Sequence, residues 1–244
     1  MQPSRPQVEA YFFGSPQRIG EKILFIKRDQ RLADYAAYLT DLEMFGNVWH
    51  GMTGRLHGEP VSVIATGVGP SLIGDAVYAL DRPGAACLYS GTCGGLHEAL
   101  EIGDYFVADQ AICGEGYSLH FGYAPFSITH GDPGTLQAIK AALATAIERF
   151  DSGVTFTTSS VVRETDKEFW RDVDSRCRII EMGAAAFYAA ALASGQRAAA
   201  YFWVTDLPTR GKSFFDQLLP QEVLTKEKRY RHAVALDMTL LACL

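Results

Sequence analysis

Cysteine is scarce in this sequence, and no two cysteines are closely spaced. The five cysteines never form a Cys-x-x-Cys pair and stand at Cys87, Cys93, Cys113, Cys177 and Cys243. An odd, scattered set of this kind is atypical of a disulfide framework or a zinc site. We therefore expect buried, reduced thiols in a cytoplasmic protein that binds no metal.

Long apolar runs are also missing. No stretch reaches the roughly 18 apolar residues that a bilayer-spanning helix needs. The N-terminal residues, MQPSRPQVEAYFFG, lack the apolar core of a secretory signal. The alanine-rich residues 183–193 are too few to cross a membrane, so a buried helix suits them better. The sequence therefore predicts cytoplasmic localisation and no membrane partner.

Basic residues are outnumbered by acidic ones. The chain has 22 Lys and Arg against 28 Asp and Glu, a formal net charge of -6. This balance argues against nucleic-acid binding, which usually needs a basic face. A small anion remains compatible, because one or two arginines can bind it locally. No Walker loop or Gly-x-Gly-x-x-Gly motif occurs, which excludes nucleoside triphosphate and dinucleotide sites of those types.

Short apolar segments alternate with helical patterns along the 244 residues, and no repeat or linker interrupts them. We expect one domain over residues 1–244. The predicted strands span residues 8–13, 61–66, 85–90, 105–112, 154–162, 177–180 and 198–204. The predicted helices span residues 31–42, 70–80, 134–149, 183–193 and 221–244. This alternation predicts an α/β protein with its ligand at the strand ends.

Glycine loops and acidic residues follow the predicted strands. The glycine loops at 14, 67–69 and 91–95, with glycines at 14, 67, 69, 91, 94 and 95, let a backbone approach an anion and aim N–H groups at it. Arg18 could close the same pocket or remain a solvated surface residue. Asp206 ends a buried strand, where a raised pKa suits a general acid, although a turn or N-cap role also fits. Glu181 could equally be a helix-start carboxylate.

Five of these segments, in this order, resemble the nucleoside phosphorylase and nucleosidase superfamily: GSPQRI, ATGVGPS, GTCGGLHEALEIGDYFVAD, IIEMGAAA and VTDLP. That superfamily includes purine nucleoside phosphorylase, uridine phosphorylase, methylthioadenosine nucleosidase and the catalytic domain of AMP nucleosidase. The resemblance implies a three-layer α/β/α fold around a mixed, partly barrel-like sheet. It also implies cleavage of an N-glycosidic bond by phosphorolysis or hydrolysis, in a homo-oligomer.

The resemblance assigns residues to the side of the site that holds the nucleophile. Gly14 and Arg18 match the phosphate-side loop of the phosphorylases, and Thr92 matches a hydroxyl that contacts phosphate and sugar. The neighbouring glycine-loop positions implied in binding are Gly67, Cys93 and Gly94. Tyr89 and Asn47 depart from the pattern, because both stand where phosphorylases place phosphate-binding arginines. The absence of these two arginines removes charge-assisted bonds to phosphate and favours hydrolysis.

On the sugar and base side, Met182 matches the methionine under the ribose, and Asp206 matches the aspartate that donates a proton toward N7 of a purine. Gly183 stands where the family has a second glutamate that holds the ribose hydroxyls. Its small size should open space for a modified or deoxy sugar, or Glu181 takes over the glutamate's role. Val162 lies near the family's base-stacking aromatic. The adjacent Arg163 either meets an anionic group of the substrate or lies in solvent.

The sequence thus predicts a nucleosidase that hydrolyses a purine-like nucleoside or nucleotide, with an atypical sugar as an option and Asp206 as the acid. It predicts no cofactor. One alternative is a phosphate-dependent phosphorylase, with phosphate as co-substrate. A second alternative is a non-catalytic relative that binds or stores a ligand.

Overall fold

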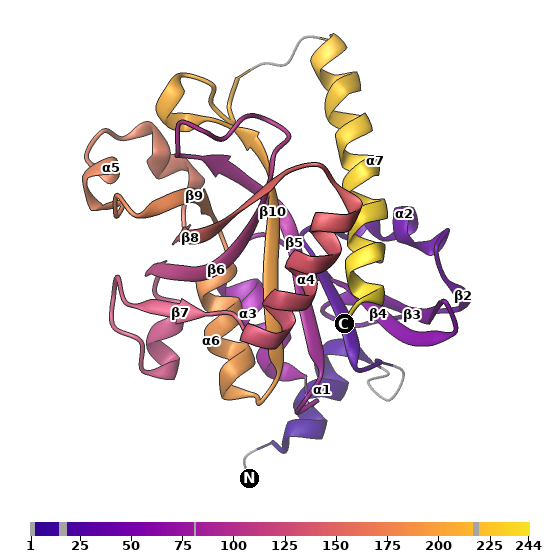
Figure 1. Cartoon of the computed structure of the whole chain (residues 1–244). Helices are drawn as coiled ribbons and strands as arrows, with labels where there is room; N and C mark the ends of the chain where they lie inside the picture. Colours follow the sequence, from indigo (N-terminus) through magenta and orange to yellow (C-terminus); the bar gives the residue numbers. More distant parts are fainter. Residues whose placement is uncertain (1–2, 15–18, 81, 217–219) are drawn as a thin grey trace.

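The computed structural model describes residues 3–14, 19–80, 82–216 and 220–244 (Figure 1). Its ten strands form one sheet. The strands are β1 (Lys22–Ile26), β2 (Thr40–Gly46), β3 (His50–Leu56), β4 (Glu59–Ala65), β5 (Ala86–Gly95), β6 (Tyr105–Gly114), β7 (Ile128–His130), β8 (Phe150–Thr158), β9 (Cys177–Glu181) and β10 (Arg197–Asp206). The α-helices are α1 (Arg5–Phe13), α2 (Leu32–Ala36), α3 (Pro70–Ala79), α4 (Pro133–Ala146), α5 (Phe169–Asp172), α6 (Ala184–Ala193) and α7 (Pro220–Ala242).

Five strands close into a ring. The order β10-β6-β8-β9-β5 returns to its start because β5 also pairs with β10 in parallel. From β5 the sheet continues through β1, β4, β3 and β2. Parallel and antiparallel pairs are mixed, since β10 runs antiparallel to β6 but parallel to β5. The predicted mixed, partly barrel-like sheet is therefore confirmed.

Successive residues of the central strands pack on opposite faces of the sheet, as the two-residue period of a strand requires. In β1, Ile23 and Phe25 join the core that contains α3 and α6, whereas Leu24 and Ile26 join the core that contains α4 and α7. All four side chains are buried, as expected for a parallel strand covered on both faces. The predicted three-layer arrangement follows, with α7 crossing one face and α6 packed on the other (Figure 1).

The N-terminal prediction was wrong. Residues 8–13 belong to the helix α1 rather than to a strand. The sequence feature that favours this helix lies at its N-cap, Ser4. The Ser4 backbone N–H donates to the Gln7 side chain at 2.8 Å, which is half of a capping box. The first strand is instead β1, which the sequence prediction missed. The loop after β1 therefore reaches the strand-end edge that was assigned to residues 14–18.

The predicted helix over residues 31–42 was also wrong in its second half. Helix α2 ends at Ala36, and Thr40–Gly46 forms the edge strand β2, which pairs antiparallel with β3. Pairing with a neighbouring strand overrides the local helical pattern here, because strand formation depends on tertiary context. In the part of the chain that the structure describes, no helix has the length and apolarity to cross a membrane.

Candidate active site

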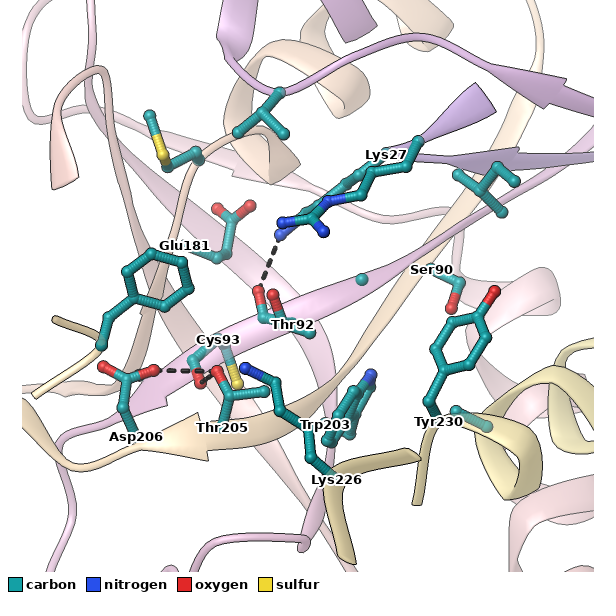
Figure 2. Close-up of a pocket in the computed structure, with 18 of the residues that line it drawn as sticks. Lys27, Ser90, Thr92, Cys93, Glu181, Trp203, Thr205, Asp206, Lys226 and Tyr230 are labelled. Carbon is teal, nitrogen blue, oxygen red and sulfur yellow. Dashed lines mark hydrogen bonds between the residues drawn. The ribbon is translucent and has the colours of Figure 1, made fainter. Parts of the chain in front are cut away.

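The ends of β1, β5, β9 and β10 surround a cavity of about 390 Å³, which the start of α7 covers. Figure 2 shows Asp206 and Thr205 at one end of this cavity and Ser90 with Tyr230 at the other. The ionisable and hydroxyl side chains that line it are Lys27, Arg28, Arg31, Tyr35, Ser90, Thr92, Glu164, Glu181, Thr205, Asp206, Lys226, Glu227, Tyr230 and Asp237. Six of the sequence-predicted residues meet here, namely Thr92, Cys93, Gly94, Glu181, Met182 and Asp206.

Asp206 is the last residue of β10, and only 6% of it is exposed. A register shift between Val204 and Asp206 interrupts the pairing with β5, after which Asp206 pairs with Gly94. One carboxylate oxygen accepts a 2.8 Å hydrogen bond from the Thr205 hydroxyl. Burial raises the pKa of Asp206, and the Thr205 hydrogen bond opposes the rise only in part. A carboxyl group in this setting retains its proton to a higher pH than usual, which suits a general acid.

Lys27 follows β1 and reaches the glycine loop of β5. Its ammonium donates to the backbone carbonyl of Thr92 at 2.8 Å, as Figure 2 shows. Burial lowers the pKa of Lys27, and the charges of Glu181 and Asp206 act in the opposite direction. The Lys27 amino group therefore lies beside Thr92, on the side of the cavity where the resemblance places the nucleophile. The sequence prediction missed Lys27 because it missed β1.

Glu181 ends β9 and directs its carboxylate at the start of α6. The backbone N–H groups of Gly183 and Ala184 donate to one oxygen at 2.6 and 3.0 Å, and the Thr157 hydroxyl donates to the other. Glu181 therefore makes the contacts expected of a carboxylate at the start of a helix, which was one of the two roles predicted for it. Burial raises the pKa of Glu181, although the Thr157 hydrogen bond and the charge of Lys27 act against this. Met182, the next residue, lines the cavity beside it.

The expectation that Gly183 opens space was wrong. A Cβ atom at this position would lie 2.8 Å from the hydroxyl oxygen of Tyr89 and 3.0 Å from a side-chain carbon of Ile73. Tyr89 is buried and packs against Phe187 and Phe202, each with ring centroids 5.4 Å away. The tyrosine therefore fills the room that a larger residue at 183 would need. The two departures from the family pattern, Tyr89 and Gly183, are therefore complementary in size.

Four other sequence-predicted residues do not line the cavity. Gly14 ends α1 and lies against Gly46 of the edge strand β2. Gly67 faces Leu72, and its neighbour Val68 lines the cavity instead. Val162 and Arg163 point away from the cavity, with Val162 63% exposed and Arg163 paired with Asp166 at 3.4 Å. Arg18 lies outside the described residues.

A buried carboxylate at the inner wall holds α7 against the sheet. Asp237 on α7 is 1% exposed and accepts hydrogen bonds from Tyr35 on α2, at 2.6 Å, and from Tyr201 on β10. Burial raises the pKa of Asp237 to about 6, and the hydroxyls of Ser90, Tyr201 and Tyr35 limit the rise. The group was not predicted, because Asp237 stands within an otherwise apolar helical end and its tyrosine partners are distant in sequence.

The first turns of α7 supply the outer wall. Glu227 forms an ion pair with Arg31 at 2.9 Å. The Arg31 guanidinium also lies 4.0 Å from the ring centre of Tyr230. Lys226, on the same helix, lines the cavity. Its charge acts against the rise in the pKa of Asp206 that burial causes. The charges in the early part of this helix were noted in the sequence, but its position over the sheet was not predictable from them. The described residues contain no group of three or more His, Cys, Asp or Glu side chains placed to hold a metal ion.

The chain is similar to nucleoside-cleaving proteins in sequence and in structure. The model of the phosphorylase superfamily matches residues 23–238, so Gly14 and Arg18 lie ahead of the match. A DeoD-type purine nucleoside phosphorylase from Clostridium beijerinckii is 31% identical over 177 residues, which cover 69% of this chain and 73% of that protein.

Solved structures extend the likeness over nearly the whole chain. A uridine phosphorylase from Vibrio fischeri has a TM-score of 0.78 at 16% identity and covers 93% of this chain and 92% of its own. An AMP nucleosidase from Bacteroides thetaiotaomicron has a TM-score of 0.76 at 20% identity, with 98% and 97% covered. The predicted fold and the prediction of a glycosidic-bond-cleaving enzyme are confirmed. By its match over residues 23–238, this chain belongs to the phosphorylase superfamily.

Proposed function

We propose that this enzyme hydrolyses the N-glycosidic bond of a purine-like nucleoside or nucleotide. The observation that carries the proposal is the nearly buried carboxyl group of Asp206. It lies in one cavity with Thr92 and Met182, which come from the ends of neighbouring strands. An acid, a hydroxyl beside a cation, and a methionine surface are the groups that base release, nucleophile binding and sugar binding require.

In the proposed reaction, Asp206 donates a proton to N7 of the leaving purine. The bond between the sugar C1′ and the base nitrogen breaks, its electron pair goes to the base, and an oxocarbenium-like sugar forms. Water attacks C1′ and gives up a proton to the solvent. Asp206 then regains its proton. Protonation of a leaving group by a placed acid typically contributes about 10²–10⁴-fold in rate.

Water is favoured over phosphate as the nucleophile because of Tyr89. Its ring is buried in the core beside Phe187 and adds no cation to the cavity. Asn47 also adds no charge, and its side-chain amide donates to the Tyr11 backbone carbonyl at 2.6 Å. Lys27 and Thr92 are then the groups that would orient the attacking water, since the ammonium already donates to Thr92.

The sugar is expected to depart from ordinary ribose. Both carboxylate oxygens of Glu181 already accept hydrogen bonds, and Gly183 has no side chain to offer. A ribose hydroxyl would therefore share an acceptor that is already used, and an unpaired polar group costs free energy when buried. This supports a deoxy or otherwise modified sugar.

The test is base release from a panel of purine nucleosides and nucleotides, each with and without phosphate. We expect free base and a free sugar or sugar 5′-phosphate in the absence of inorganic phosphate. The Asp206→Asn variant should keep the fold and lose about 10²–10⁴-fold in turnover, whereas the exposed Asp41→Asn control should not. A sugar 1-phosphate formed only with phosphate would establish phosphorolysis, for which Lys27, Arg28 and Arg31 at the cavity would supply the cations. Full activity in Asp206→Asn would overturn the assignment of the acid.

A further inference from the structure

A short 3₁₀ helix, η4 (Val161–Thr165), presents an acidic side chain to the cavity. Such a helix has three residues per turn, so residues three apart lie on the same side. Val161 and Glu164 accordingly line the cavity, whereas Val162 is 63% exposed and Arg163 pairs with Asp166. The side of η4 that faces the ligand therefore carries one apolar and one carboxyl group.

Among the residues that the structure describes, Glu164 has no side-chain partner that would explain its position. Within the described residues, its carboxylate makes no hydrogen bond and no ion pair, although the residue is half-buried. Its backbone carbonyl accepts a 3.0 Å hydrogen bond from the Trp170 indole, which ties η4 to α5. The segment is thus held in place while the carboxyl group remains available to a ligand.

The neighbour that bears on this carboxyl group is Asp206. Burial, and then the charge of Asp206, raise the pKa of Glu164 to about 7. Glu164 and the proposed acid line the same cavity, and the leaving base must lie beside Asp206. Two neighbouring carboxyl groups resist simultaneous ionisation, so one tends to hold a proton while the other accepts hydrogen bonds.

We propose that Glu164 recognises the substituent at C6 of the purine whose N7 receives the proton of Asp206, and that it selects a 6-amino purine. The inference rests on the proposed function. Adenine presents the N7 acceptor and the 6-amino donor side by side on one edge, whereas guanine presents two acceptors, N7 and O6. A 6-amino donor stabilises the ionised form of Glu164, which leaves the proton shared by the two carboxyl groups on Asp206, opposite N7. A 6-oxo group would instead face the carboxylate acceptor without a proton between them.

Protonation of Glu164 should weaken this preference, because a protonated carboxyl group can donate to a 6-oxo group. The charged groups that line the cavity with Glu164 from other elements include Lys27, Glu181, Asp206 and Lys226. On the η4 and α5 side, Arg163 pairs with Asp166 and Arg171 with Glu168. Asp206 donates to N7 of both kinds of base, so loss of its proton lowers both activities, and its charge affects their ratio only through the protonation of Glu164.

The experiment compares base release from matched pairs that differ only at C6: adenosine with inosine, AMP with IMP, and the 2′-deoxy counterparts of each pair. For the wild type, we expect kcat/KM to favour the 6-amino member, with a ratio that rises as pH increases through about 7. Glu164→Gln should lower the ratio by about tenfold, the contribution of one charge-assisted hydrogen bond. It should also remove the pH dependence of the ratio, because an amide both donates and accepts. Glu168→Gln, an exposed carboxylate on the adjacent α5, is the control and should leave the ratio unchanged.

The outcomes separate the two proposals. Release of base with a ratio that neither pH nor Glu164→Gln alters overturns the inference and leaves the proposed function standing. A wild-type preference for the 6-oxo member of these pairs also overturns the inference. Failure of the wild type to release base from these pairs and from the wider panel of purine nucleosides and nucleotides overturns the proposed function, and the inference with it. The wild-type pH series does not depend on a variant, so it tests the inference even if Glu164→Gln folds poorly.

Discussion

The buried carboxyl group of Asp237 should make the free energy of unfolding depend on pH in a way that Asp237→Asn removes. In the folded protein, burial raises the pKa of Asp237 from its ordinary value of 3.8 to about 6. The folded state therefore holds this proton more tightly than the unfolded state does. The associated stability is fully present below pH 3.8 and is lost as pH rises through about 6.

The size of the effect follows from the two pKa values. A shift of one pKa unit corresponds to about 1.4 kcal/mol. Between about pH 4.5 and pH 7.5, the two titration curves of Asp237 predict a loss of roughly 2 kcal/mol in the free energy of unfolding. An asparagine can accept from one tyrosine hydroxyl and donate to the other, so the contacts with Tyr35 and Tyr201 can be kept. The variant should thus gain roughly 2 kcal/mol relative to wild type as the pH rises over this interval.

The measurement is urea unfolding of both proteins at the two pH values, followed by tryptophan fluorescence. Taking the difference between variant and wild type cancels the titration of every other carboxyl group. Asp41→Asn, whose side chain is 75% exposed, is the matched control and should show no such trend. A difference between Asp237→Asn and wild type that stays constant with pH, or that changes in the opposite direction, would refute the reasoning.

Two further predictions concern the pair at position 183 and the cavity lysine. Gly183→Ala should lower the free energy of unfolding by about 1–3 kcal/mol through overpacking against Tyr89, and combining it with Tyr89→Leu should recover part of that loss in urea unfolding. Additive losses in the double variant would contradict the proposed complementarity. Lys27→Met should lower kcat for base release at least about tenfold without lowering the free energy of unfolding, since it removes a charge whose burial is costly. Wild-type kcat in Lys27→Met would exclude the ammonium from the reaction.

Much of the fold was predictable because the central strands are short apolar runs that precede glycine loops. The sequence predicted β5, β9 and β10, and with them Thr92, Glu181 and Asp206 at the cavity. The first strand was not predicted, since Lys22–Ile26 carries no turn signal before its basic loop, and residues 8–13 imitate a strand although a capped helix forms there. Because of this one error, the prediction placed residues 14–18 at the strand ends of the site, whereas the loop that follows β1 lies there.

The remaining differences depend on contacts that join distant parts of the chain. The filling of position 183 by Tyr89 follows from side-chain packing between β5 and α6, which a linear pattern does not report. At η4, the sequence identified the right segment but the wrong residues. Val162 and Arg163 stand out by residue type, whereas the three-residue period of the helix turns Val161 and Glu164 inward.

The residues that line the cavity fall into two groups, those on the closed ring of strands and those on elements outside it. Thr92 pairs with Trp203, and Asp206 with Gly94 after a register shift, on two parallel strands of that ring. A one-residue slip of either strand would turn its side chains to the opposite face, so the span from Thr92 to the proposed acid Asp206 is set by the sheet itself. The cavity walls supplied by η4, where we propose that the base is recognised, and by α7 lie outside the ring. Preference for one base over another can therefore diverge by exchanges in η4 while the bond that is broken stays the same.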